Sequence, residues 1–357
     1  MSETGTAAGE AEAIDDPVGY FLQDMAYHGR SDRTVEEYER VLRRYESFLS
    51  DPGGTPFDQP VPVDEATHRH CLAWVSDLRG SLAGSSVAIY ASYVHRFYDY
   101  MSELGAFDRN PMRLVREEMD EGIDRDPTRR EITVPGMRSF VRSIGHPLER
   151  AVVLTLLKTG MRVGELCNLD LRDVSISHDG AESTYDLGTR GVLDGKPDSI
   201  YVPAEPREGE AYDGEVRTAS NKRKRGTVIP VDDELRRELV RWLAVRPDTD
   251  PERPAEPLFV RTGRGWGRRP TPRDVHYFVT DLAEGEGWYD PNADATENVT
   301  PHYFRHFFTT HLRDRTGDRG IVKYLRGDVA DDIIDTYTHN WGDSVRRTYE
   351  EHVFRLL

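Results

Sequence analysis

Hydrophobic positions recur at helical spacing over most of the first third of the chain. Apolar residues fall at 18, 21, 22 and 25, and again at 38, 41, 42, 45, 48 and 49 after a capping Ser31. A Pro- and Gly-rich loop at 51–62 precedes two further helices, expected at 65–78 and 85–104, and Asn110-Pro111 ends the group. The pattern therefore predicts a helical N-terminal domain over residues 16–118.

The second part of the chain alternates between helical and strand-like periods. Charged residues dominate 117–130, so we expect a linker at 119–130. Beyond it the pattern predicts helices at 136–144, 147–158, 163–168, 232–245, 271–284, 302–313 and 320–325, and strands at 173–176, 199–202, 214–217 and 226–231, with a polar loop at 204–213. This predicts a second domain over 131–357 and a chain that is mainly α with a small antiparallel sheet (α+β). The acidic residues 1–15 read as a disordered tail.

Charge and cysteine content indicate the salt conditions and the cellular compartment of the protein. The 64 acidic residues exceed the 47 basic ones, which gives a formal net charge of −17, and lysine occurs only at 158, 196, 222, 224 and 323. An acidic surface with so little lysine indicates adaptation to molar salt, where charge repulsion is screened. The alternative is an acidic protein from an organism that lives at ordinary salt concentrations. Cys71 and Cys167 form no CxxC pair, and no signal or membrane-spanning pattern appears, so we expect a cytoplasmic protein.

Three short motifs in the C-terminal half carry the candidate chemistry. They are TGMRVGEL at 159–166, PHYFRH at 301–306 and DTYTH at 335–339, with a basic turn and strand at 220–231 between the first two. Together they supply arginines, a lysine, histidines and a tyrosine. Guanidinium groups bind phosphate oxygens, a phenol can attack phosphorus, and Lys and His can move protons, so the set suits chemistry on a phosphodiester.

Each motif also has a plainer interpretation. Gly160 ends one helix so that Arg162 begins the next, but Arg162 and Glu165 could also be a surface ion pair at i, i+3. His302 and Arg305 share a helix face with His306, although the two histidines could instead hold a metal or be buried structural groups. The cluster Lys222, Arg223, Lys224 and Arg225 could be a solvated turn rather than a DNA contact.

The ordered motifs resemble the catalytic domain of the tyrosine recombinase (phage integrase) family from about residue 131 to the C-terminus. The segment DRTVEEYERVLRRYESFL at 32–49 is similar to the core-binding domain of that family. The resemblance implies cleavage and rejoining of double-stranded DNA through a 3′-phosphotyrosine, without metal, ATP or another cofactor. It also implies inverted-repeat recombination sites and a homo-tetramer on DNA.

The resemblance assigns roles to individual positions. It implies that Arg162 and Arg305 bind the phosphate, Glu165 supports Arg162, Lys222 protonates the leaving oxygen, His302 accepts a proton and Tyr337 is the nucleophile. Lys222 lies eight residues before Pro230, the usual spacing, and Lys224 is the alternative. We expect Arg223, Lys224 and Arg225 to contact DNA.

One position departs from the family pattern. Where the family usually has Leu-Gly-His, nine residues before the tyrosine, this chain has Arg326-Gly327-Asp328. An ionised aspartate cannot donate a hydrogen bond to phosphate. The role of the family's histidine could be dispensable in this chain, or His339 or Trp341 could take it, or activity could be reduced.

Several alternatives stay open. Tyr349 is a rival nucleophile, although it falls in what reads as a tail helix. An apolar stripe at 345, 349, 353 and 356 could dock into a neighbouring protomer or onto its own domain. Two other functions also remain: a DNA-binding protein of this fold without cleavage, and a metal-dependent hydrolase built on His302 and His306.

Overall fold

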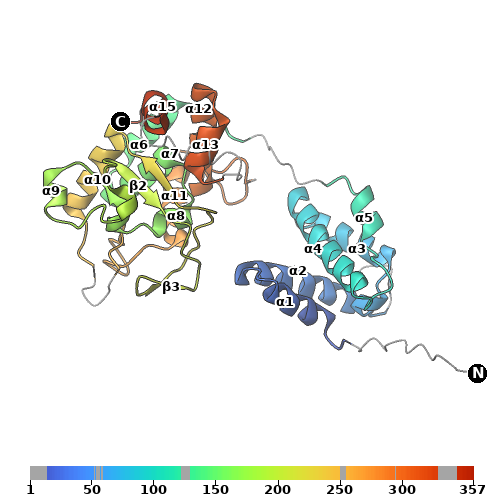
Figure 1. The fold of residues 1–357 in the computed structure, drawn as a ribbon. Coiled ribbons are helices and arrows are strands. Elements are labelled where there is room, and N and C mark those ends of the chain that lie inside the picture. Colours follow the sequence, from blue (N-terminus) through green and yellow to red (C-terminus); the bar gives the residue numbers. More distant parts are fainter. Residues whose placement is uncertain are drawn as a thin grey trace, which may run out of the picture. The chain divides into compact units, whose positions relative to one another are not determined.

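The computed structural model describes residues 14–51, 53, 57, 59–121, 129–249, 255–293, 295–328 and 344–357. The chain divides into two compact units, Met1–Pro127 and Thr128–Leu357, which we describe separately (Figure 1). Among the described residues, no helix is both long and apolar enough to cross a membrane.

The N-terminal unit is a helical bundle with an aromatic core. Its helices are α1 (Pro17–Tyr27), α2 (Asp32–Ser50), α3 (His68–Arg79), α4 (Gly84–Glu103) and α5 (Arg113–Glu118). Tyr45 and Trp74 meet edge to face in the centre, and the Tyr45 hydroxyl lies 3.1 Å from that of Tyr98. Tyr98 in turn donates to the Val63 carbonyl at 2.8 Å, so the buried phenols are satisfied while their rings fill the core.

Helix α5 was not expected, because Asn110-Pro111 was predicted to end the bundle. The Asn110 side chain accepts from the Met112 amide at 2.9 Å and donates to the His95 carbonyl at 3.1 Å. These bonds turn the chain back toward the bundle, where Met112 and Val115 are buried. The proline therefore makes a corner between two helices of the same core.

The second unit is mainly helical with a small antiparallel sheet, as predicted. Its helices are α6 (Val134–Ser143), α7 (Pro147–Thr159), α8 (Val163–Cys167), α9 (Asp179–Glu182), α10 (Asp233–Val245), α11 (Pro272–Gly285), α12 (Pro301–Thr316), α13 (Arg319–Arg326) and α15 (Ser344–His352). Helix α7 is buried along almost its whole length and packs against α10 and α12. The sheet has the order β1 (Val174–Ser175), β2 (Ser199–Val202), β5 (Thr227–Pro230).

The connection between β2 and β5 differs from the expectation. Strand β5 pairs with β2, in a register that sets Ser199 opposite Pro230 and Val202 opposite Thr227. The intervening chain folds into a second ribbon of β3 (Ala211–Tyr212) and β4 (Glu215–Val216), where the sequence predicted a polar loop followed by a single strand. Buried Arg217 pairs with Asp170 at 3.0 Å and ties this ribbon to the domain, a long-range contact that strand periodicity cannot predict.

The C-terminal segment packs onto the rest of the second unit. The Tyr349 hydroxyl of α15 donates to the Lys158 carbonyl at 2.9 Å, and the Leu356 amide donates to Glu234 at 2.7 Å. The Lys158 ammonium is fully buried between Asp232, at 2.6 Å, and Glu234, at 2.7 Å, and it also donates to the Phe354 carbonyl. The apolar stripe thus docks in cis in this structure, on a buried ion cluster at the end of α7.

We predict that Lys158→Met lowers the free energy of unfolding by about 3 kcal/mol, because it leaves buried carboxylates without their cation. Chemical denaturation of the full chain measures this, with Lys323→Met on an exposed face of α13 as the control. Equal stability losses for the two variants would show that the buried cluster does not anchor the tail.

Candidate active site

Arg162 stands where α7 gives way to α8. Gly160 ends α7 with φ of +62°, and a Cβ there would collide with the Phe308 ring of α12, so glycine alone fits this close turn. The turn leaves Arg162 at the N-cap of α8, with its guanidinium reaching outward. Its Nη1 donates to the Lys222 carbonyl at 3.2 Å, and its Nη2 donates to Asp328 Oδ1 at 2.6 Å.

Glu165 holds Arg162 from beneath. The carboxylate has no exposed surface; it accepts from the Arg162 amide at 2.9 Å and from Arg162 Nη1 at 3.0 Å. The same carboxylate accepts from Arg223 Nη2 at 3.0 Å. One buried acid therefore fixes two arginines, which is a stronger positioning contact than the exposed i, i+3 pair that the sequence also allowed.

Arg305 reaches the same point from α12. Its side chain is 2% exposed, and Nη1 donates to the Gly160 carbonyl at 2.6 Å and the Arg326 carbonyl at 3.0 Å. Nη2 lies 2.7 Å from both carboxylate oxygens of Asp328. Burial, together with the charges of Arg326 and Arg162, lowers the pKa of Arg305 to about 10, so the group stays cationic at neutral pH.

Asp328 is the shared anion of these arginines. It also lies 2.9 Å from Arg326 Nη2, so three guanidinium groups converge on a single carboxylate. Burial acts to raise the pKa of Asp328, but Arg305, Arg326 and Arg162 outweigh it and hold the pKa below its usual value. The aspartate is ionised, and its two oxygens mark a position where an anion is bound.

His302 lies in the first turn of α12 and keeps an exposed face. Surrounding protein lowers its pKa, and the positive charges of Arg129, Arg305 and Arg326 add to the effect. The imidazole is therefore neutral at pH 7 and can accept a proton. Among the residues described, no group of three His, Cys, Asp or Glu side chains is placed to hold a metal ion.

The basic turn before β5 separates into exposed and buried members. Lys222, Lys224 and Arg225 are exposed, and the Lys222 carbonyl contacts Arg162. The Arg223 side chain has no exposed surface and donates to Glu165 and to the Leu325 carbonyl, at 3.2 Å. This geometry does not allow the DNA contact we expected of Arg223, because the buried acid Glu165 draws the guanidinium inward.

The two candidate nucleophiles differ sharply. Tyr337 lies outside the described residues, as do His339 and Trp341. Tyr349 is fully buried with its hydroxyl bonded to the Lys158 carbonyl, and burial raises its pKa well above the ordinary value. A phenol so enclosed cannot meet a phosphodiester, so the structure contradicts the rival assignment.

Sequence reasoning gave Arg326 no role, yet it belongs to this site. It ends α13 and faces Asp328 beside the two expected arginines. The signal was present in the sequence, since two of three residues depart from the Leu-Gly-His pattern and carry opposite charges. Only the fold shows that both charges point to the same place.

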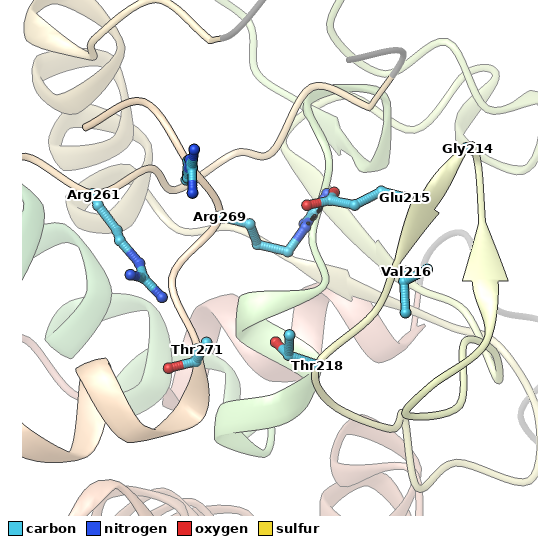
Figure 2. Close-up of a pocket in the computed structure, with 8 residues that line it drawn as sticks. Gly214, Glu215, Val216, Thr218, Arg261, Arg269 and Thr271 are labelled. Atoms are coloured by element: carbon cyan, nitrogen blue, oxygen red, sulfur yellow. Dashed lines mark hydrogen bonds and ion pairs between the residues drawn. The ribbon is translucent and has the colours of Figure 1, made fainter. Parts of the chain in front are cut away.

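A separate pocket lies between the β3–β4 ribbon and the segment before α11 (Figure 2). Its walls include Glu215 and Thr218 from one side and Arg261, Arg269 and Thr271 from the other. Arg269 is 4% exposed and pairs with Glu215 at 2.9 Å, while also donating to the Cys167 carbonyl at the end of α8. These contacts stabilise the C-terminal end of α8. None of the expected catalytic residues that the structure describes lines the pocket.

Comparison with known proteins gives the same class as this fold and site. Residues 20–103 match the model of the phage integrase N-terminal SAM-like domain, and residues 210–342 match that of the phage integrase family. The tyrosine recombinase XerA of Pyrococcus horikoshii is 24% identical over 93% of this chain and 91% of its own length. The tyrosine recombinase XerC of Lacticaseibacillus casei is 26% identical over 87% of this chain and 88% of its own.

Solved structures agree on the fold. The Tn1549 transposon integrase superposes with a TM-score of 0.65 at 19% identity, covering 94% of this chain and 98% of that one. A lambda integrase superposes with a TM-score of 0.56 at 14% identity, covering 88% and 94%. The chain belongs to the tyrosine recombinase family.

The ionisation of Asp328 predicts how stability depends on pH. Because its pKa is lowered in the folded protein, its contribution is complete above the ordinary carboxyl pKa of about 4 and is lost as the pH falls through the lowered value. We expect Asp328→Asn to be about 2 kcal/mol less stable than the parent at pH 7, with the gap closing in acid. Thermal unfolding across pH measures this, with Asp314→Asn as an exposed control. A gap that stays constant with pH would contradict an ionised Asp328.

Proposed function

We propose that this chain is a site-specific DNA recombinase that cleaves and rejoins strands through a 3′-phosphotyrosine intermediate, without metal or ATP. The observation that carries the proposal is that Arg162, at the start of α8, and Arg305, on α12, converge on one carboxylate, that of Asp328. Two guanidinium groups fixed before the substrate arrives stabilise the extra negative charge of a pentacoordinate phosphorus with little reorganisation. The related Tn1549 and lambda integrases were solved in complex with DNA, which supports DNA as the partner.

The proposed reaction exchanges one phosphoester for another. The Tyr337 oxygen bonds to phosphorus as the bond to the 5′-oxygen of the DNA breaks. His302, neutral at pH 7, accepts the phenolic proton, and Lys222 gives a proton to the departing 5′-oxygen. Since the phosphotyrosine is itself an ester, a second 5′-hydroxyl can reverse the steps on a new strand.

Other aspects remain predictions drawn from the sequence and the resemblance. We propose that Lys224 and Arg225, both exposed beside Lys222, contact the DNA backbone. We further propose a homo-tetramer acting on inverted-repeat sites in the cytoplasm. Adaptation to molar salt also stays a prediction.

A second function is a DNA-binding protein of this fold that does not cleave. Asp328 favours the non-cleaving function, because its carboxylate pairs with both arginines that are expected to bind phosphate. Whether DNA displaces that carboxylate decides between the two functions.

Tyr337→Phe is expected to abolish covalent protein–DNA adducts on a nicked suicide substrate and to leave DNA binding within about twofold, because only the nucleophilic oxygen is lost. Denaturing gels and peptide mapping of the adduct measure this. An adduct that persists in the variant, or that maps to another residue, would sink the assignment of Tyr337. A wild-type protein that binds the site and forms no adduct would support the non-cleaving alternative.

Lys222→Ala is expected to slow cleavage about 100-fold or more on normal DNA, a typical contribution of general acid catalysis. A 5′-bridging phosphorothiolate should restore most of that rate, because its sulfur leaves as a thiolate without needing a proton. Lys224→Ala is the matched control two residues away. Rescue of Lys224→Ala alone would move the role to that residue, and rescue of neither would remove the general acid from this turn.

A further inference from the structure

Three guanidinium groups share one carboxylate at the candidate active site. Asp328 Oδ1 accepts from Arg162 Nη2 at 2.6 Å and from Arg305 Nη2 at 2.7 Å. Asp328 Oδ2 lies 2.7 Å from Arg305 Nη2 and 2.9 Å from Arg326 Nη2. Each carboxylate oxygen thus contacts two arginines. A phosphodiester would offer its two non-bridging oxygens to the same donors.

The main chain fixes Arg326 at this position. The Arg326 carbonyl accepts from Arg305 Nη1 at 3.0 Å, and the preceding Leu325 carbonyl accepts from Arg223 at 3.2 Å. Gly327 then turns the chain with φ of +74°, and a Cβ there would press against the Arg223 side chain. The backbone at Arg326 is therefore tied to the same arginines that form the site, and its position does not depend on the contact between the Arg326 side chain and Asp328.

The charges leave room for a second anion or a replacement. Arg223 is neutralised by Glu165 at 3.0 Å, and that carboxylate also supports Arg162. Among the described residues, Glu165 and Asp328 are the carboxylates that pair with these four arginines, so two negative charges face four positive ones. Within the described residues, the Nε of Arg326 is also buried without a hydrogen-bond partner. A buried N–H of this kind is costly unless another acceptor arrives.

We propose that Arg326 is a third phosphate-binding residue of the cleavage site, and that Asp328 holds the place of the scissile phosphate until DNA displaces it. This inference rests on the proposed function and extends it. The family pattern has leucine and histidine at positions 326 and 328, where this chain has a cation and an anion. The phosphate ligand is thereby moved from position 328 to position 326, and the carboxylate keeps the three arginines together in the DNA-free protein.

The alternative is that Arg326 serves only to neutralise Asp328. The two cases separate when the aspartate is removed first. In an Asp328→Asn background, a merely neutralising Arg326 has no partner left, so replacing it changes nothing further. A phosphate-binding Arg326 still matters there, because replacing it removes a contact to phosphate.

The experiment compares Asp328→Asn with Asp328→Asn/Arg326→Leu in the full chain. Inorganic phosphate is titrated at constant ionic strength and its binding is followed by thermal shift. Single-turnover cleavage of a nicked duplex is measured in parallel. We expect Asp328→Asn to bind phosphate more tightly than the parent, and Arg326→Leu to weaken that binding about 10- to 100-fold and to slow cleavage by a similar factor. Arg326→Lys, which keeps the charge, should recover part of the loss.

Arg319→Leu in the same background is the matched control, because Arg319 is exposed on the same helix. Phosphate binding that is unchanged by Arg326→Leu, in protein that retains its unfolding transition, would overturn the inference. If phosphate binding depends on Arg326 but neither the parent nor Asp328→Asn cleaves DNA, the anion site stands and the proposed function fails. If both proteins cleave and Arg326→Leu does not alter the rate, the inference fails and the proposed function stands.

Discussion

The site depends on holding several arginines close together in a partly buried space. Like charges at this distance repel, and burial makes the repulsion stronger, so the cluster depends on the carboxylates that balance it. Glu165 balances the charges of Arg162 and Arg223. Asp328 balances those of Arg162, Arg305 and Arg326. Glu165 is enclosed by the fold, whereas Asp328 is partly exposed and, in our proposal, holds the position that a phosphodiester takes.

The scaffold serves this arrangement through a few local devices. Gly160 lets α7 end against the Phe308 ring, so that its carbonyl accepts from Arg305 and Arg162 begins α8. Gly327 ends α13 and turns Asp328 toward the arginines. Because both glycines adopt positive φ, the side chains of the candidate site are placed by backbone turns that no other residue adopts easily.

The sequence predicted what depends on local pattern. Helical periodicity located α2, α4 and α10, and the order of the motifs led to Arg162, His302 and Arg305. It could not predict long-range ion pairs, so it placed the Arg223 side chain on DNA although Glu165 draws it inside. Strand β4 lies within the strand predicted at 214–217, but β3 and its pairing with β4 were missed for the same reason, since a buried Arg217–Asp170 pair anchors the ribbon. In the sequence, Asp328 appeared only as the loss of the histidine that the family usually has there. The structure shows in addition that the Arg326 side chain pairs with Asp328.

The most direct test is a structure of the Tyr337→Phe protein bound to a duplex with an intact scissile phosphate. We expect the non-bridging oxygens of that phosphate to lie within hydrogen-bond distance of Arg162, Arg305 and Arg326. The Asp328 carboxylate would be displaced from all three. Finding Asp328 still bound to these arginines, with the phosphate held elsewhere, would contradict the account.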